Sequence, residues 1–210
     1  MMTVEHRAEN DRVMEPGSIR GFIAVDLPAA VRRSLEALAL ELKKSDAPVS
    51  WTRTEGIHLT LKFLGNVAPA TIDQIKPVLA EIASGATVFR IQAAGCGAFP
   101  NIKQPRVIWA GMRGESEPLT RLQKEVDLAM VRFGFEPEDR PFRPHLTLGR
   151  VKGRQRLHAL QQILLTHQEF TAEPFDVTEL VLYKSELRPD GARYTPLFRA
   201  PFSGRPRLSG

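Results

Sequence analysis

The tetrapeptide His-Leu-Thr-Leu occurs twice in the chain, at residues 58–61 and again at residues 145–148. In an extended strand, residues two apart point to the same side, about 6 to 7 Å apart, so each copy places an imidazole beside a hydroxyl. One imidazole can act as a base while a second, protonated one acts as an acid. Hydroxyls can donate to a phosphoryl oxygen as charge builds on it. The pattern therefore indicates phosphodiester chemistry carried by His58, Thr60, His145 and Thr147.

Two other uses of these residues compete with catalysis. First, a histidine on a half-buried sheet can be a structural residue whose polar atoms are hydrogen-bonded, and a threonine can be present because it favours strands. This structural role explains one copy of the motif better than it explains the presence of two. Two histidines can also ligate Zn²⁺ or Fe²⁺. Such a site normally needs a third ligand, and neither tetrapeptide brings a Cys, Asp or Glu on the same strand face. We therefore expect no metal and no other cofactor.

Alternating polarity predicts that each motif lies on a strand. Around the first motif, Ile57, Leu59, Leu61 and Phe63 alternate with His58, Thr60 and Lys62. The second motif repeats this pattern within residues 144–151, and each copy follows roughly the same elements, a strand and a helix. One face of each strand would be buried and the other polar. We predict two similar lobes related by an approximate twofold axis.

The other predicted elements decide the fold class. Further strands are expected at residues 19–25, 88–93, 107–111, 177–183 and 194–198, and helices at residues 31–42, 72–82, 119–133 and 157–164. Strands and helices alternate irregularly and strands are sometimes consecutive, which favours an α+β fold over a doubly wound parallel sheet. We expect flexible tails at residues 1–18 and 203–210, and one bilobal domain over residues 19–202.

Composition excludes several classes of protein. Of 210 residues, 42% are hydrophobic and 25% charged, which is ordinary for a globular chain and excludes a disordered one. The single cysteine, Cys96, excludes a disulfide scaffold and suits a reducing compartment. No segment approaches the roughly 18 apolar residues of a membrane helix, and the N-terminus lacks an export signal, so we expect a cytoplasmic protein away from membranes. The formal charge of +5 permits a polyanionic partner, although an ordinary solvated surface explains it equally well.

Several segments besides the two motifs resemble one family. They are Arg20–Val25, Gly97–Asn101, Pro105–Gly111, Pro141–Pro144, Ser185–Leu187 and Gly191–Thr195. Together with the two His-x-Thr-x motifs, they make the sequence similar to the 2H phosphoesterase superfamily, specifically the bacterial and archaeal RNA 2′,3′-cyclic phosphodiesterases, also called 2′-5′ RNA ligases. The resemblance covers about residues 19–202.

This resemblance implies a bilobal α+β fold in which two antiparallel sheets face a central cleft and helices lie outside. It also implies metal-independent hydrolysis of RNA 2′,3′-cyclic phosphate ends to a 2′-phosphate, with reversible 2′-5′ ligation of certain RNA ends. By motif, His58 would be the proton donor to the departing 3′ oxygen and His145 the proton acceptor that activates water. Thr60 and Thr147 would hold the non-bridging oxygens. The residue pattern alone does not distinguish the acid from the base, and we infer no obligate protein partner.

Five further residues are candidates for substrate binding. Arg150 follows the second motif, but regular alternation points it away from His145, and only a bulge at Gly149 would turn it toward the cleft. Lys62 has the parity of Thr60 and would add positive charge to the cleft. The remaining candidates are Arg143, which would guide the RNA backbone, and Phe99 and Tyr194, which would stack on a base or else pack in the core.

Two alternative functions remain compatible with the same motifs. One is a phosphodiesterase acting on a small cyclic nucleotide or nucleotide-sugar derivative, which the length of the preferred substrate would reveal. The other is a non-catalytic module that binds phosphorylated RNA ends, which the absence of turnover would reveal.

Overall fold

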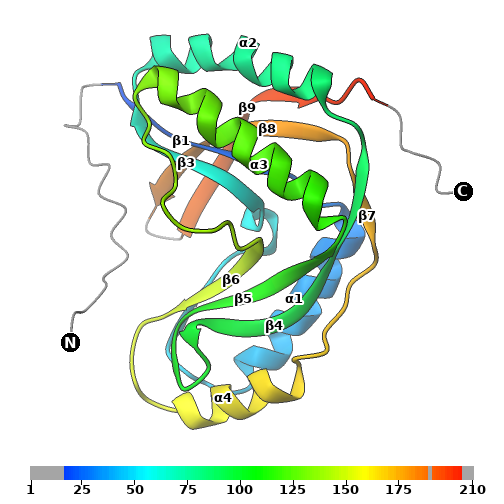
Figure 1. Cartoon of the computed structure of the whole chain (residues 1–210). Helices are drawn as coiled ribbons and strands as arrows, with labels where there is room; N and C mark the ends of the chain where they lie inside the picture. The colour runs from blue at the N-terminus through cyan, green and yellow to red at the C-terminus, as the bar shows by residue number, and fades with distance from the viewer. Residues whose placement is uncertain (1–16, 189–190, 205–210) are drawn as a thin grey trace, which may run out of the picture.

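The computed structural model describes residues 17–188 and 191–204, which form two antiparallel sheets flanked by helices (Figure 1). The four-stranded sheet has the order β3 (Leu59–Val67), β1 (Ile19–Val25), β8 (Glu179–Arg188) and β9 (Gly191–Pro201). The five-stranded sheet has the order β2 (Val49–Trp51), β6 (His145–Val151), β5 (Gln104–Gly114), β4 (Phe89–Asn101) and β7 (Phe175–Val177). The predicted α+β class with two antiparallel sheets is confirmed.

The helices lie on the outside of the two sheets. They are α1 (Ala29–Lys43), α2 (Pro69–Gly85), α3 (Ser116–Met130) and α4 (Leu157–Thr166), with short 3₁₀ turns η1 (Thr54–Gly56) and η2 (Val131–Phe133). Figure 1 shows α2 and α3 over the four-stranded sheet, and α1 and α4 beside the five-stranded one. Each helix buries one apolar stripe, as in α1, where Val31, Leu35, Leu38 and Leu42 are buried. The resulting core holds the two motif strands in place.

The two sheets contain the same internal pairing, which supports the predicted twofold relation. The paired residues are Ala24–Thr60 and Val25–Leu59 between β1 and β3, and Trp109–Thr147 and Ala110–Leu146 between β5 and β6. In each unit one extra residue follows the threonine, Leu61 in β3 and Leu148 in β6, where the register shifts. Both motifs are therefore followed by a β-bulge at the same position.

Some boundaries differ from those predicted. The strand predicted over residues 177–183 is two strands, because β7 ends at Val177 and pairs in one sheet while β8 begins at Glu179 in the other. Gly204, predicted to lie in the C-terminal tail, forms a parallel bridge with Thr87. Residues 205–210 of that tail, and residues 1–16 of the N-terminal one, lie outside the described residues. No described helix is long and apolar enough to cross a membrane.

Candidate functional site

The first motif histidine stands directly before β3 and is fixed by the backbone and by aromatic rings. Nδ1 of His58 lies 3.0 Å from the carbonyl oxygen of Gly56, to which an Nδ1 hydrogen can donate. The imidazole packs against Tyr183 at 4.3 Å, Tyr194 at 5.3 Å and Phe22 at 5.6 Å between ring centroids. The side chain is buried, so its orientation is set by the fold.

The second motif histidine, the first residue of β6, is held in the same way. Nδ1 of His145 lies 2.8 Å from the carbonyl oxygen of Arg143, again two residues earlier in the chain. Its ring packs edge-on against Phe99, with the centroids 5.0 Å apart. Because both Nδ1 atoms face a carbonyl acceptor, both imidazoles favour the tautomer whose Nε2 is free to exchange a proton with a substrate.

Burial determines the protonation of both imidazoles in the free protein. It lowers the pKa of His58 to about 4, and the positive charge of Arg32 acts in the same direction, while the carboxylate of Asp26 opposes it. Burial also lowers the pKa of His145, opposed by the hydrogen bond to the Arg143 carbonyl and assisted by the charge of Arg150. Burial thus favours the neutral form of both rings in the free protein.

Hydrogen bonds tie the segment leading to the first motif to the strand of the second. Trp51 of β2 pairs with Gly149 of β6, and the backbone nitrogen of Thr52 donates to the carbonyl oxygen of Leu148 at 2.8 Å. The η1 turn follows at once and leads into His58. The strands β3 and β6 themselves are in contact, although they belong to different sheets. The fold thus brings the two motif strands together.

Arg150 faces the same side as the second motif because of the bulge. The extra residue, Leu148, moves Arg150 opposite Val107, so its side chain shares the face of Thr147. Burial lowers the pKa of His145 and raises that of Tyr194. The charge of Arg150 adds to the first shift and opposes the second, which places Arg150 near rings from both sheets. The sequence allowed Arg150 to point away from His145, or toward the same side if a bulge occurred. The structure contains such a bulge, and Arg150 points to the side of the motif.

The prediction for Lys62 is wrong, and the matching bulge in β3 is the reason. The extra residue, Leu61, turns Lys62 to the helix side of the sheet, where its side chain is 3% exposed. Its Nζ lies 2.5 Å from a carboxylate oxygen of Asp127 and 2.5 Å from the carbonyl oxygen of Glu136. The position that Lys62 was expected to take on the motif face belongs to Phe63, which is 58% exposed.

Comparison with known proteins identifies the family. A model of the 2′-5′ RNA ligase superfamily matches residues 26–189, which include both motifs. The chain belongs to this superfamily. An RNA 2′,3′-cyclic phosphodiesterase of Methanothermobacter thermautotrophicus is 36% identical over 85% of this chain and 96% of its own length. Another, from Escherichia coli, is 29% identical over 86% of this chain and 94% of its own.

Solved structures in the superfamily share the fold. A protein of Thermus thermophilus superposes with a TM-score of 0.74 at 27% identity, covering 89% of this chain and 99% of that one. Escherichia coli LigT complexed with 3′-AMP superposes with a TM-score of 0.69, also at 27% identity and with the same coverage. The arrangement of two antiparallel sheets is therefore that of LigT.

The remaining predicted binding residues have packing or surface positions in this superfamily member. Phe99 lies against His145, and Tyr194 lies between Phe22 and His58, so both rings support an imidazole. The Arg143 side chain is exposed, while its backbone carbonyl holds His145. Base stacking by the two rings, and guidance of RNA by Arg143, stay predictions.

Sequence reasoning missed four residues that surround the first histidine. Phe22 and Tyr183 face it from β1 and β8, and Asp26 and Arg32 act on its pKa. Phe22 lies in the strand predicted over residues 19–25, and Asp26 follows its end. Residues an even number apart in a strand share a face, so this spacing could have placed Phe22 and Asp26 on the same side. Nothing in the sequence pattern indicates the positions of Tyr183 and Arg32, because both act across elements far apart in the chain.

Within residues 17–188 and 191–204 there is no group of three or more His, Cys, Asp or Glu side chains that could hold a metal ion. A cavity of about 190 Å³ is lined by residues 25–28 and 176–179. Its lining includes Asp26 but neither motif histidine, so this cavity is separate from the two imidazoles.

Gly56 is required where it stands, because a side chain there would strike Tyr194. A Cβ on Gly56 would lie 2.9 Å from Cε2 of that ring. The Gly56 carbonyl orients His58, so Gly56→Ala is expected to displace the imidazole and lower kcat roughly 10- to 100-fold, since small misplacements have effects of that size. Steady-state kinetics checks this. Gly85→Ala is the control, because no atom lies within 4 Å of a Cβ there; an equal kcat for both variants would contradict it.

Proposed function

We propose that this protein hydrolyses RNA 2′,3′-cyclic phosphate ends to 2′-phosphates by two-histidine acid and base catalysis. The observation that carries the proposal is the matched pair of imidazoles, buried at His58 and half-buried at His145. Each is held at Nδ1 by the carbonyl two residues earlier, at 3.0 Å for His58 and 2.8 Å for His145. The names of the similar archaeal and bacterial proteins support the choice of substrate. The single cysteine fits a reducing compartment such as the cytoplasm, where we infer that the enzyme acts.

The proposed reaction is an in-line displacement at phosphorus. His145 takes a proton from water, whose oxygen attacks the phosphorus as the bond to the 3′ oxygen breaks. His58 gives its proton to that oxygen, leaving a 3′-hydroxyl and a 2′-phosphate. Attacking and leaving oxygens must lie on opposite sides of the phosphorus. Two histidines related by a pseudo-twofold suit that requirement, since the axis would pass between them.

Hydroxyl and guanidinium groups would stabilise the charge that develops. The threonines of the two motifs, Thr60 and Thr147, lie on the same strand faces as the histidines and would donate to the non-bridging oxygens. Arg150, turned to that side by the bulge, would add a fixed positive charge. A 5′-hydroxyl that takes the place of water would join two RNA ends through a 2′-5′ linkage, and this reversible ligation is part of the proposal.

The lowered histidine pKa values predict an unusual pH dependence. The acid, His58, has its pKa lowered to about 4, and the base, His145, also has a lowered pKa. Above neutral pH the protonated fraction of His58 in the free enzyme falls tenfold per pH unit, so kcat/KM should fall about tenfold per unit between pH 7 and 8.5. A bound phosphodiester anion raises the pKa of His58, so the fall in kcat should begin at higher pH. A flat kcat/KM across this range would contradict the assigned acid.

A product assay tests the proposed function. The protein is incubated with EDTA and an oligonucleotide ending in a 2′,3′-cyclic phosphate, and the product end is identified. We expect a 2′-phosphate and a 3′-hydroxyl. Turnover of cyclic mononucleotides but not of the oligonucleotide would favour the small-nucleotide alternative, and binding without turnover would favour the RNA-binding module. Activity that EDTA abolishes and Zn²⁺ restores would contradict metal-independent catalysis.

A further inference from the structure

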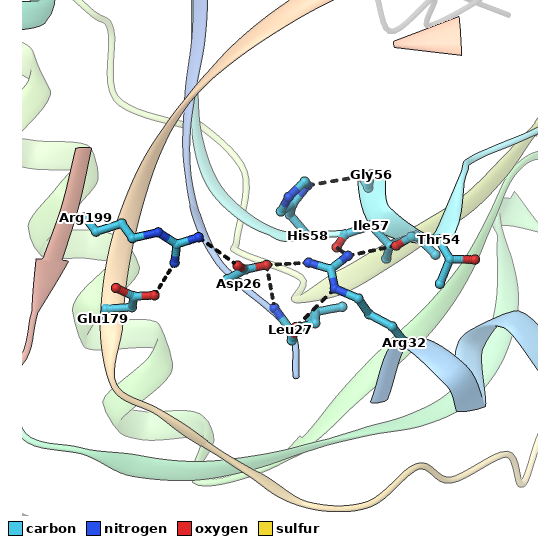
Figure 2. Close-up of polar contacts among 9 residues, drawn as sticks. All are labelled: Asp26, Leu27, Arg32, Thr54, Gly56, Ile57, His58, Glu179 and Arg199. Atoms are coloured by element: carbon cyan, nitrogen blue, oxygen red, sulfur yellow. Dashed lines mark hydrogen bonds and ion pairs between the residues drawn. The ribbon is translucent and has the colours of Figure 1, made fainter. Parts of the chain in front are cut away.

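A single arginine outside both motifs ties together the chain segments around the first histidine. Arg32, on α1, donates from Nη1 to the carbonyl oxygens of Thr54 at 2.8 Å and Ile57 at 3.1 Å. Its Nε donates to the carbonyl oxygen of Leu27 at 3.1 Å, and its Nη2 pairs with the carboxylate of Asp26 (Figure 2). The guanidinium thus joins the end of β1, the start of α1 and the η1 turn.

The turn held by Arg32 is the one that orients His58. The carbonyls of Thr54 and Ile57 stand on either side of Gly56, whose own carbonyl accepts from Nδ1 of His58. The η1 turn has three residues and no side-chain cap. The Thr54 carbonyl also accepts from the backbone nitrogen of Ile57 at 3.2 Å, so the guanidinium adds a second hydrogen bond to the one that closes the turn. A shift of the turn would therefore be transmitted directly to the imidazole.

Asp26 fixes the guanidinium from the other side. Its carboxylate accepts from the backbone nitrogen of Leu27 at 2.9 Å and pairs with Arg199 at 3.4 Å, while Arg199 also pairs with Glu179 (Figure 2). The Arg32 side chain is 19% exposed and that of Asp26 26%. The planar guanidinium of Arg32 thus donates to four acceptors and is mostly shielded from solvent. A lysine, with a flexible side chain and a single ammonium group, cannot reproduce these four hydrogen bonds.

The second lobe has a glycine at the position that corresponds to Asp26. The pair Val25–Leu59 in the first lobe corresponds to the pair Ala110–Leu146 in the second. The residue after Val25 is Asp26, and the residue after Ala110 is Gly111, which pairs with His145. Asp26 and Gly111 therefore occupy corresponding positions. The carboxylate of the first lobe is therefore replaced by a hydrogen in the second. The ion pair between Arg32 and Asp26 therefore distinguishes the surroundings of His58 from those of His145.

We propose that Arg32, oriented by Asp26, is the positioning residue for His58. This proposal rests on the proposed function and deepens it. Arg32 does not touch the substrate. It fixes the Gly56 carbonyl, and through it the Nδ1 hydrogen bond and the direction in which Nε2 of His58 faces the departing oxygen. Substrate binding would be largely independent of it, because Thr60, Thr147 and Arg150 lie on other elements.

The test compares Arg32→Met and Arg32→Lys with the wild-type enzyme on a 2′,3′-cyclic mononucleotide. Both variants are expected to lower kcat roughly 10- to 100-fold, since a misplaced catalytic group has effects of that size. KM should change less than about threefold, and lysine should not rescue kcat. In spectra of protein labelled with ¹⁵N-histidine, the Nδ1 hydrogen signal of His58 should weaken in both variants while that of His145 persists.

Arg90→Met is the matched control. It removes another arginine–aspartate pair, Nε of Arg90 to Asp176 at 2.7 Å and Nη2 at 3.2 Å, on the exposed edge between β4 and β7. It should leave kcat and both histidine signals unchanged. Restoration of kcat by lysine would show that only charge matters and would overturn the proposal, as would an unchanged His58 signal in Arg32→Met. The spectra need no turnover, so they decide the role of Arg32 even if the cyclic phosphate assay fails.

Discussion

Replacing either motif histidine with alanine is expected to lower kcat on a 2′,3′-cyclic phosphate by about 10²- to 10⁴-fold, the range typical of general acid or base catalysis. The effect should be similar for His58 and His145, because each imidazole is held at Nδ1 by the backbone carbonyl two residues earlier in the chain. Single-turnover hydrolysis in EDTA measures it. Thermal unfolding of each variant should show that the fold is retained.

A substrate with an easier leaving group separates the two roles. When sulfur replaces the 3′ oxygen, the departing thiolate needs no proton. The loss caused by His58→Ala should then shrink, while the loss caused by His145→Ala should persist, because water must still be activated. The opposite result would exchange the assigned roles. His158→Ala is the control, since His158 is exposed on α4 and lies outside both motifs. Activity within threefold of wild type in both motif variants would contradict two-histidine catalysis.

The two motif histidines and the class of fold could be recognised from the sequence, because both depend on local patterns. The repeated motif marks two strands, and alternation about Leu59 and Leu146 places them with one face in the core, as found. The pairing of the strands into two sheets was reached through the family resemblance. The break between β7 and β8 at Thr178 was missed, because a continuous apolar run carries no sign that its two halves join different sheets.

The orientation of the proposed binding residues was harder to predict, because the two bulges reverse the alternation after each motif. Period two holds as far as Thr60 and Thr147, and then the extra residues Leu61 and Leu148 exchange the two faces. Gly149 gave a hint of the second bulge, whereas the first bulge falls in a run with no glycine or proline. Arg32 could not be found either, because its partners are mostly backbone carbonyls, which leave no pattern in the sequence.

The bulge that removes Lys62 from the motif face creates a buried ion pair, and breaking that pair is expected to have the largest effect on stability. The side chains of Lys62 and Asp127 are 3% and 10% exposed. Asp127 also accepts from the backbone nitrogen of Glu138 at 3.0 Å. Asp127→Ala leaves the buried lysine ammonium with only the exposed carboxylate of Glu138, 3.8 Å away, so the free energy of unfolding should fall by about 3 to 5 kcal/mol. Urea unfolding measures the change, from a lower midpoint at an unchanged slope.

The double variant Lys62→Met, Asp127→Leu separates the pair from the individual charges. Because it leaves no unpaired buried charge, it should recover much of the stability lost in Asp127→Ala. The exposed pair between Lys76 and Asp73 is the control, and Asp73→Ala should change the free energy by less than about 1 kcal/mol. If Asp127→Ala were as mild as this control, Lys62 would have to be reaching solvent. The same two side chains hold residues 136–138, which lead to Arg143 and His145. The double variant removes both of these contacts, so kcat should fall in Asp127→Ala and stay low in the double variant although stability recovers.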